Sequence, residues 1–272
     1  MIDWHPILVS GLLMLAMAFG TWLLSLALRD VSIVDSLWSL FFLGAAITCM
    51  LLSAETGLRA ILVLGLVAVW AVRLSGYLTW RNWGEPEDQR YQTFRRNHDP
   101  GFAFKSLYII FFLQASLAWI ISFPIYTAMS GPWPIGPLDY AGAVLVVVGI
   151  GFETLADWQL ARFKARPANS GKVLDTGLWR YTRHPNYFGD FCVWWGLYLI
   201  AASAGGWWTV FSPILMSVML LKVSGVTLLE KDIGKRRPAY ADYIARTNAF
   251  FPGPRKSAVT QATAAAKTVN PK

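Results

Sequence analysis

Long apolar stretches recur along the 272-residue chain and restrict its fold more than any other feature. They cover residues 7–28, 31–52, 58–80, 104–129, 138–163, 191–204 and 207–226. A helix of ~20 apolar residues crosses the hydrocarbon core of a bilayer. With 55% hydrophobic residues, the chain is also more apolar than an ordinary soluble domain. We therefore predict an all-α, polytopic membrane protein with seven transmembrane helices.

The positive charges are distributed unevenly around these stretches. All but three of the 24 lysines and arginines lie at or beyond the ends of the first, third, fifth and seventh stretches. The positive-inside rule then predicts an N-terminus outside and a C-terminus in the cytoplasm. Basic cytoplasmic loops explain the net charge of +8, so we expect no nucleic-acid partner. The two cysteines and three histidines do not cluster, and we expect no metal site.

Six polar or aromatic side chains stand out inside the predicted spans. They are Asp35 and Trp38 in the second, Trp70, Arg73 and Tyr77 in the third, and Gln114 in the fourth. Spacings of three and four residues place those of one helix on a common face. A charge at the centre of a span costs ~2.5–3.5 kcal/mol on insertion scales, and such residues usually mark functional sites. We therefore treat this group as candidate functional residues.

The polar loop 81–101 has two interpretations. It mixes aromatic residues with charges of both signs, from Arg81 to Tyr91 and beyond. One interpretation is a solvated surface loop, and the other is a partly ordered cap over a site. The sequence leaves both open.

The most polar border of an apolar stretch is the segment 179–190. It contains Arg180, Tyr181, Arg183, His184, Asn186, Tyr187 and Asp190. The preceding predicted helix ends with Glu153 and Asp157, whose spacing of four places both carboxylates on one face. Like charges on one helix face repel, which is tolerable if they bind donors.

Such a mixture of side chains suits a dinucleotide. Carboxylates accept from ribose hydroxyls, guanidinium groups bind phosphates, and an amide pairs with a base or carboxamide edge. Binding to anionic lipid headgroups explains the lysines but not the acidic pair. No Gly-x-Gly-x-x-Gly fingerprint follows a strand, so a Rossmann site is not indicated. His184 is either a general base or a phosphate-orienting group, and Lys164, Arg166 and Lys172 are candidates for a 2′-phosphate.

The segment Arg183-His184-Pro185-Asn186-Tyr187-Phe188-Gly189-Asp190, with Trp194-Trp195-Gly196 after it, resembles the NADPH-binding signature of membrane sterol reductases. Residues 149–252 resemble the C-terminal domain of the steroid 5-alpha-reductase family. The whole chain is most similar to the bacterial branch described as DUF1295. This resemblance implies a single transmembrane reductase domain over residues 1–254, with the NADPH part at 149–252. Residues 255–272 are rich in Ala, Thr and Lys, and this composition predicts a disordered tail. It also implies a bacterial inner-membrane protein whose cofactor site faces the cytoplasm.

The resemblance carries roles onto individual residues. Asp157, Asn186 and Tyr187 match cofactor-contacting positions, and Arg183 and His184 match the sterol-reductase form of the motif. Asp190 stands where steroid reductases have glutamate, Glu153 where they have an amide, and Tyr243 and Arg246 align with the family's terminal Tyr and Arg. The segment 228–232 lacks the arginine of the sterol reductases. The expected cofactor site thus comprises Glu153, Asp157, Arg162, Lys164, Arg180, Tyr181, Arg183, His184, Asn186, Tyr187, Asp190, Tyr243 and Arg246.

The implied reaction is hydride transfer from NADPH to an activated C=C bond of a steroid-like or other lipid. Steroid reductases stabilise the charge on the carbonyl oxygen with a tyrosine and a glutamate. Here Asp35 can replace the glutamate, and Arg73 or Tyr77 can supply the second donor. These three are the predicted catalytic residues, and Trp38, Trp70 and Gln114 the predicted substrate contacts.

Two other functions stay open. Isoprenylcysteine carboxyl methyltransferases, which use S-adenosylmethionine, share the Arg-His-Pro-x-Tyr core. That family normally has paired glutamates in its C-terminal segment, where this chain has only Glu230. A non-enzymatic lipid-binding or transport protein is the third possibility. The sequence does not indicate an oligomeric state.

Overall fold

The computed structural model describes residues 3–53, 57–131, 134–223 and 239–256, and these residues are mostly helical. The helices are α1 (Trp4–Leu28), α2 (Ile33–Leu52), α3 (Leu58–Asn82), α4 (Gln89–His98), α5 (Phe102–Ser106), α6 (Leu113–Ile121), α7 (Phe123–Ser130), α8 (Pro137–Lys164), α9 (Pro185–Ser203), α10 (Phe211–Val218) and α13 (Ala239–Arg246). Short 3-10 or π segments are η1 (Leu107–Phe112), η2 (Pro167–Asn169), η3 (Gly177–Arg180), η4 (Trp207–Val210) and η5 (Met219–Val223). Within these ranges no strand forms, apart from an isolated bridge between Thr182 and Asn248. The all-α prediction is confirmed.

Five helical stretches in the described part of the chain are long and apolar enough to cross a membrane. They are α1, α2, α3, the continuous stretch Phe102–Ser130 and α8. Such helices are compatible with an integral membrane protein. The two remaining predicted spans differ: α9 carries Asn186 and Asp190 in its first two turns, and the apolar stretch Trp207–Lys222 is shorter than 18 residues. Seven spans and the orientation of the termini therefore stay predictions.

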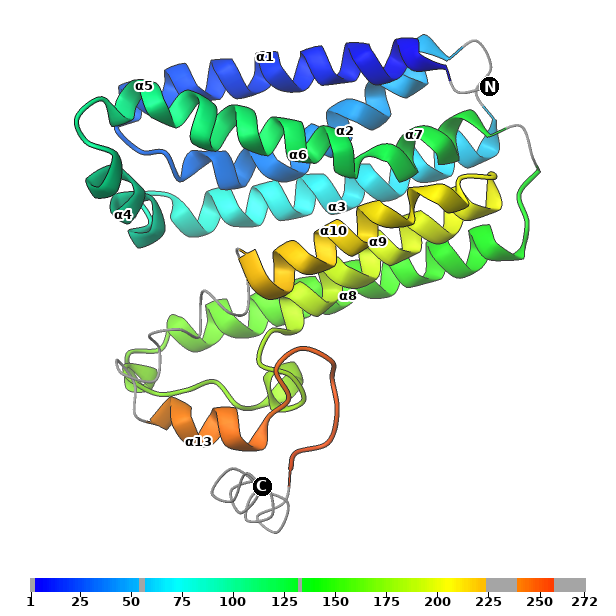
Figure 1. Cartoon of the computed structure of the whole chain (residues 1–272). Helices are drawn as coiled ribbons and strands as arrows, with labels where there is room; N and C mark the ends of the chain where they lie inside the picture. Colours follow the sequence, from blue (N-terminus) through cyan, green and yellow to red (C-terminus); the bar gives the residue numbers. More distant parts are fainter. Residues whose placement is uncertain (1–2, 54–56, 132–133, 224–238, 257–272) are drawn as a thin grey trace, which may run out of the picture. The chain divides into compact units, whose positions relative to one another are not determined.

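The chain divides into two compact units. The first comprises Met1–Val144 and Gly196–Ser212, and the second Leu145–Trp195 and Pro213–Lys272. In the first unit α2 is central, because it contacts α1, α3, α6 and α7 (Figure 1). Its apolar stretch is 56% buried, compared with 22% for α1 and for α3. The outer faces of α1 and α3 are therefore the ones available to lipid.

A buried ion pair fastens one end of the first unit. Arg59, in the first turn of α3, donates from Nε to Asp139 Oδ1 (2.7 Å) and from Nη2 to Asp139 Oδ2 (3.0 Å), and both residues are buried. Asp139 also accepts from the Ser203 hydroxyl (2.5 Å) and from the backbone of Gly136 (2.8 Å). The pair thus joins the starts of α3 and α8 to the end of α9. We missed it in the sequence, where Arg59 looks like an isolated charge.

Close glycine contacts bring α8 and α9 together. In the second unit, a Cβ on Gly189 of α9 would lie 2.6 Å from the Glu153 nitrogen and 2.6 Å from the Gly149 oxygen of α8. In the first unit, a Cβ on Gly142 would lie 2.6 Å from the Gly196 oxygen. Small residues allow such close backbone approach between membrane helices. Glu153 is therefore held at the point where the two helices touch.

Some helix boundaries differ from the sequence expectation. The helix after the polar segment begins at Pro185 rather than at residue 191, because proline is favoured in the first helical turn. The segment from Asn186 to Asp190 is therefore helical. Near Pro124, where the sequence predicts a kink, α6 and α7 are separated at Ser122.

The first two residues of the expected disordered tail, Arg255 and Lys256, belong to the described part of the chain. Arg255 donates to the carboxylate of Asp175 at 3.0 Å, so it is part of the ordered second unit. Residues 257–272 and the segment 228–232, including Glu230, lie outside the described residues.

Candidate functional site

In the second unit, the segment that precedes α9 rests on α8. Gly177 adopts a left-handed conformation (φ 61°), and a Cβ there would lie 2.5 Å from the Gln159 side chain. The side-chain oxygen Oε1 of Gln159 accepts a hydrogen bond from the backbone N–H of Leu178 (3.0 Å). The Trp179 indole donates to the backbone oxygen of Ala156 (3.1 Å). These contacts fix residues 177–179, at the start of the polar segment, against α8.

The residues after α13 bind back onto this segment. The Arg183 backbone donates to Asn248 O (2.9 Å), and the Gly253 backbone donates to Tyr181 O (3.1 Å). The Thr182 hydroxyl donates to Phe250 O at 2.7 Å. The polar segment is therefore tied both to α8 and to the C-terminal part of the described chain.

Three predicted cofactor residues make structural contacts within these ties. Arg183 donates from Nη1 to the carbonyl oxygens of Thr247 (2.6 Å) and Ile244 (3.2 Å). Tyr243 donates to Trp179 O (2.5 Å), and burial raises the pKa of its phenol, so the donor stays protonated at neutral pH. Arg246 pairs with Asp175 at 3.0 Å. These side chains hold backbone in place, which sequence comparison alone does not reveal.

Charged and polar side chains are buried where α8 meets the start of α9. Their exposed fractions are 4% for Glu153, 5% for Asp157, 7% for Arg183, 4% for His184 and 8% for Asp190. The His184 ring also stacks on Tyr187, with centroids 5.7 Å apart. Buried charges are costly unless they are paired, hydrogen-bonded or used in a site. We call these five residues the α8–α9 cluster.

Other predicted cofactor residues lie at the surface of the second unit. Arg162, Lys164, Arg180 and Tyr181 are exposed, as are Arg166 and Lys172. The Arg162 guanidinium lies over the Trp158 ring, 5.2 Å from its centroid. Asn186 is half-buried, and its side chain makes no hydrogen bond to any residue that the structure describes. The Asn186 amide and the exposed Arg180 guanidinium can therefore contact a ligand.

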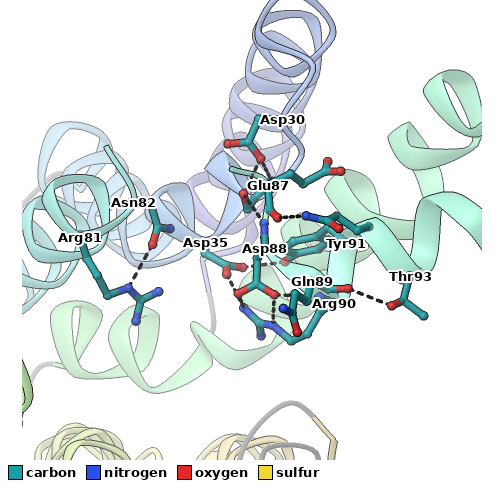
Figure 2. A network of polar contacts seen from close by, with 12 residues as sticks. Asp30, Asp35, Arg81, Asn82, Glu87, Asp88, Gln89, Arg90, Tyr91 and Thr93 are labelled. Carbon is teal, nitrogen blue, oxygen red and sulfur yellow. Dashed lines mark hydrogen bonds and ion pairs between the residues drawn. The ribbon is translucent and has the colours of Figure 1, made fainter. Parts of the chain in front are cut away.

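In the first unit, part of the loop 81–101 forms the helix α4, and we call the ordered residues 87–98 the cap. Figure 2 shows its centre: Tyr91 of α4 donates to Asp35 Oδ1 of α2 at 2.6 Å, and Arg90 donates to Asp35 Oδ2 at 2.8 Å. The Gln114 amide lies 3.4 Å from the Tyr91 oxygen, which can accept its hydrogen bond. Tyr91 is buried. The structure thus joins two predicted site residues, Asp35 and Gln114, through a phenol that we did not predict.

The start of α4 is stabilised by its own acids. Asp88 is the N-cap and accepts from the Arg90 backbone at 2.8 Å. Although burial alone would raise the pKa of Asp88, its hydrogen bonds with Arg90 hold it below the usual value. Glu87 accepts from the Val31 backbone (2.9 Å) and from Arg95 (2.7 Å). The cap is thereby fastened to the turn between α1 and α2.

Burial changes the acidity of the central phenol. It raises the pKa of Tyr91 well above the usual value, and the neighbouring Asp35 carboxylate raises it further. Tyr91 is therefore protonated throughout the neutral range. Its single proton is directed at Asp35 in this structure.

The remaining predicted substrate and catalytic residues lie along α2 and α3. Trp38 and Trp70 both pack against Phe42, with ring centroids 5.3 and 5.7 Å apart. Tyr77 lies beneath the Arg81 guanidinium, 5.9 Å from the ring centroid. Arg73 is half-buried on α3. The described partners of Asp35 are Arg90 and Tyr91 and do not include Arg73 or Tyr77.

Comparison with known proteins gives the chain a family. The profile of the family described as "Protein of unknown function (DUF1295)" matches residues 21–247, which is most of the chain. The chain belongs to the DUF1295 family. It is also 26% identical over 283 residues to an uncharacterized protein of Schizosaccharomyces pombe, with 91% of this chain and 80% of that protein covered. No solved structure matches the DUF1295 chain.

The matched region contains both polar clusters of this DUF1295 protein. Asp35 and Tyr91 of the cap lie inside it, as does the α8–α9 cluster. The sequence held a signal for α4 that we did not use, because aspartate is a favoured N-cap residue and Asp88 directly precedes the helix that contains Tyr91. Their partner on α2 could not be found from spacing.

Proposed function

We propose that the chain is an NADPH-dependent membrane reductase that transfers a hydride to an activated C=C bond of a lipid or steroid-like substrate. The observation that carries this proposal is the α8–α9 cluster. Three carboxylates, an arginine and a histidine are buried together in one unit of a protein rich in apolar helices. Ionisable residues are rare in apolar helices and usually mark a functional site, for which we propose a polar ligand.

The side chains around the cluster suit the parts of a dinucleotide. Glu153 and Asp157 offer acceptors to ribose hydroxyls, and Asn186 offers an amide to a carboxamide or base edge. The exposed cations Arg162 and Arg180 offer donors to phosphate oxygens. Lys164, Arg166 and Lys172 stay our candidates for a 2′-phosphate. When bound, NADPH supplies the hydride.

Arg183, Tyr243 and Arg246 act as positioning residues in this proposal. They fix the backbone of the segment 179–183 and of the residues after α13. Asn186 and His184 then sit on a helix start whose position is set by these contacts. Site residues need such support to keep their geometry.

The first unit offers a means of stabilising a substrate oxygen. Hydride addition to an enone places negative charge on its oxygen, and hydrogen-bond donors lower the energy of that state. Two such donors lie together here, the Tyr91 phenol of the cap and the Gln114 amide of α6. The Tyr91 hydroxyl donates its hydrogen bond to Asp35 in this structure. It would have to break that hydrogen bond to donate to a substrate oxygen. Arg73 and Tyr77 of α3 stay further candidates.

The finer topology belongs to the same proposal. We infer seven spans, an N-terminus outside, a C-terminus in the cytoplasm and a cofactor site on the cytoplasmic side of a bacterial inner membrane. The support is the distribution of lysine and arginine, 24 residues of which only three depart from the pattern.

The reaction can be tested by isotope transfer. The purified full chain is incubated with a membrane lipid extract and NADPH deuterated at the reactive carbon of the nicotinamide. We expect mass spectrometry to find a reduced lipid in which one carbon of the former C=C bond carries deuterium from NADPH and the other carries hydrogen from a proton. A parallel incubation contains S-adenosylmethionine with a labelled methyl group in place of NADPH. Transfer of that methyl group to a lipid, with no deuterium transfer from NADPH, would contradict the proposal and support a methyltransferase. Lipid binding without either transfer would support a lipid-binding protein.

A further inference from the structure

A groove of about 250 Å³ lies in the first unit, where α1 ends and α5 begins. Its walls come from the end of α1, the turn after it, α4 and α5. They include Ser25, Arg29, Arg95, Phe102 and Ser106. None of the predicted cofactor or substrate residues lines it.

The groove lies at the edge of the apolar part of the unit. The apolar stretch of α1 ends at Leu28, and the apolar stretch Phe102–Ser130 begins beside it. Leu24, Leu28 and Phe104 are all exposed next to this edge. If both helices cross the membrane, the edge is the level at which lipid acyl chains give way to headgroups.

Two guanidinium groups reach the groove, and they differ in their surroundings. The Arg29 side chain makes no hydrogen bond or ion pair with any described residue. Arg95 donates from Nε and Nη2 to Glu87, and its guanidinium lies 4.7 Å from the centroid of the Phe102 ring. Glu87 therefore compensates the charge of Arg95. The acid next to Arg29, Asp30, accepts from the backbone of Ser32 at 2.8 Å and from its hydroxyl.

The backbone at Arg29 adds a second observation. Arg29 occupies the left-handed conformation (φ 55°) directly after α1, a position where glycine is usually favoured. Among the residues that the structure describes, it is the only one other than glycine with a positive φ. A guanidinium is thus held at the lip of the groove in a backbone position that does not favour its side chain.

We propose that this groove binds the phosphate of a membrane phospholipid, with Arg29 as its main ligand and Arg95 as a second donor. The single uncompensated charge of Arg29 matches the single negative charge of a phosphodiester. Arginine binds phosphate oxygens through its planar fork of N–H donors. The acyl chains would lie on the exposed apolar side chains of α1 and α5.

Native mass spectrometry of the purified full chain tests the site. Phosphatidylglycerol is added, and diacylglycerol with the same chains serves as the lipid without phosphate. We expect phosphatidylglycerol to bind and diacylglycerol to bind about tenfold less, because charge-assisted hydrogen bonds are lost. Equal binding of the two lipids would overturn the proposal.

Matched variants locate the phosphate. Arg29→Gly removes the guanidinium and suits the left-handed backbone, and Arg29→Asn removes the charge with a residue that tolerates this conformation. Both should lower the bound fraction about tenfold, whereas Arg96→Ala, an exposed arginine on α4, should not. Wild-type binding in both Arg29 variants would overturn the proposal, as would displacement of the lipid by millimolar inorganic phosphate, which would assign the groove to a free anion.

Discussion

Tyr91 and Asp35, 56 residues apart in the sequence, are joined by a hydrogen bond of 2.6 Å. This bond ties α4 to the central helix α2, and Arg90 strengthens it through a second contact to the same carboxylate. The loop 81–101 is therefore partly ordered, and polar contacts join it to α2. Whether it covers a site stays a prediction.

Tyr91→Phe should loosen the cap. It removes a donor to a charged acceptor in a buried position, which typically contributes about 1.5–3 kcal/mol. The free energy of unfolding in detergent measures the loss, and hydrogen exchange should rise in α4. Tyr108→Phe is the control, because Tyr108 is exposed. Equal effects of the two substitutions would contradict the assignment.

The same phenol predicts a dependence on alkaline pH. Since the pKa of Tyr91 is raised in the folded protein, its contribution to stability is complete below its unfolded pKa of about 10. That contribution is lost as pH rises through the folded pKa. Wild type should therefore lose more stability than Tyr91→Phe as pH rises above about 10. Parallel pH profiles from thermal unfolding of the two proteins would exclude this linkage.

The cap illustrates what the sequence could and could not predict. The mixture of aromatic residues and charges left a partly ordered cap open as one interpretation, and Asp35 and Gln114 stood out as polar residues in apolar stretches. Which side chain would meet Asp35 depended on how the loop folds over α2. From the sequence we proposed Arg73 or Tyr77 of α3 as the second donor beside Asp35. In the structure, the donors that contact Asp35 are Arg90 and Tyr91.

The buried pair of Arg59 and Asp139 should be needed for folding. Arg59→Ala leaves the Asp139 carboxylate buried without its main partner, which typically costs about 3–5 kcal/mol. Replacing both residues by alanine should cost less than Arg59→Ala or Asp139→Ala alone, because no charge is then left alone. Unfolding free energies of the three variants measure this. If the double variant lost the sum of the single losses, the two residues would not be coupled.

Gly189→Ala should separate α8 from α9. A methyl group there meets backbone atoms of Gly149 and Glu153, and overpacking of this kind costs about 1–3 kcal/mol. Gly151→Ala is the matched control, because a Cβ at that position meets nothing within 4 Å. It should stabilise α8 by roughly up to 1 kcal/mol, as alanine favours helix. Thermal unfolding measures the stability of both variants. An equal loss of stability in the two would contradict the close contact between α8 and α9 at Gly189.

The second unit shows a further limit of sequence reasoning. The spacing of Glu153 and Asp157 predicted that both lie on one helix face, and the structure adds that both are buried and that α9 touches α8 beside Glu153. Arg183, Tyr243 and Arg246 look like ligands for phosphate by residue type. Their contacts to backbone oxygens and to Asp175 depend on the path of the chain after α13, which no local pattern specifies.

Asn186→Ala should separate cofactor binding from folding. Its side chain makes no hydrogen bond within the described chain, so stability should change by less than about 0.5 kcal/mol. Affinity for NADPH should fall about tenfold if the amide binds the cofactor. Arg183→Ala is a poorer probe, because it also removes donors to Thr247 and Ile244. Unchanged NADPH affinity in Asn186→Ala would remove this residue from the proposed site.

The central claim, that the second unit binds NADPH, is tested most directly by isothermal titration of the purified full chain. NADPH and S-adenosylmethionine are titrated in parallel under the same conditions. We predict saturable binding of NADPH with a dissociation constant of roughly micromolar order, as is usual for enzymes near their substrate levels, and no binding of S-adenosylmethionine. Saturable binding of S-adenosylmethionine without binding of NADPH would contradict the account.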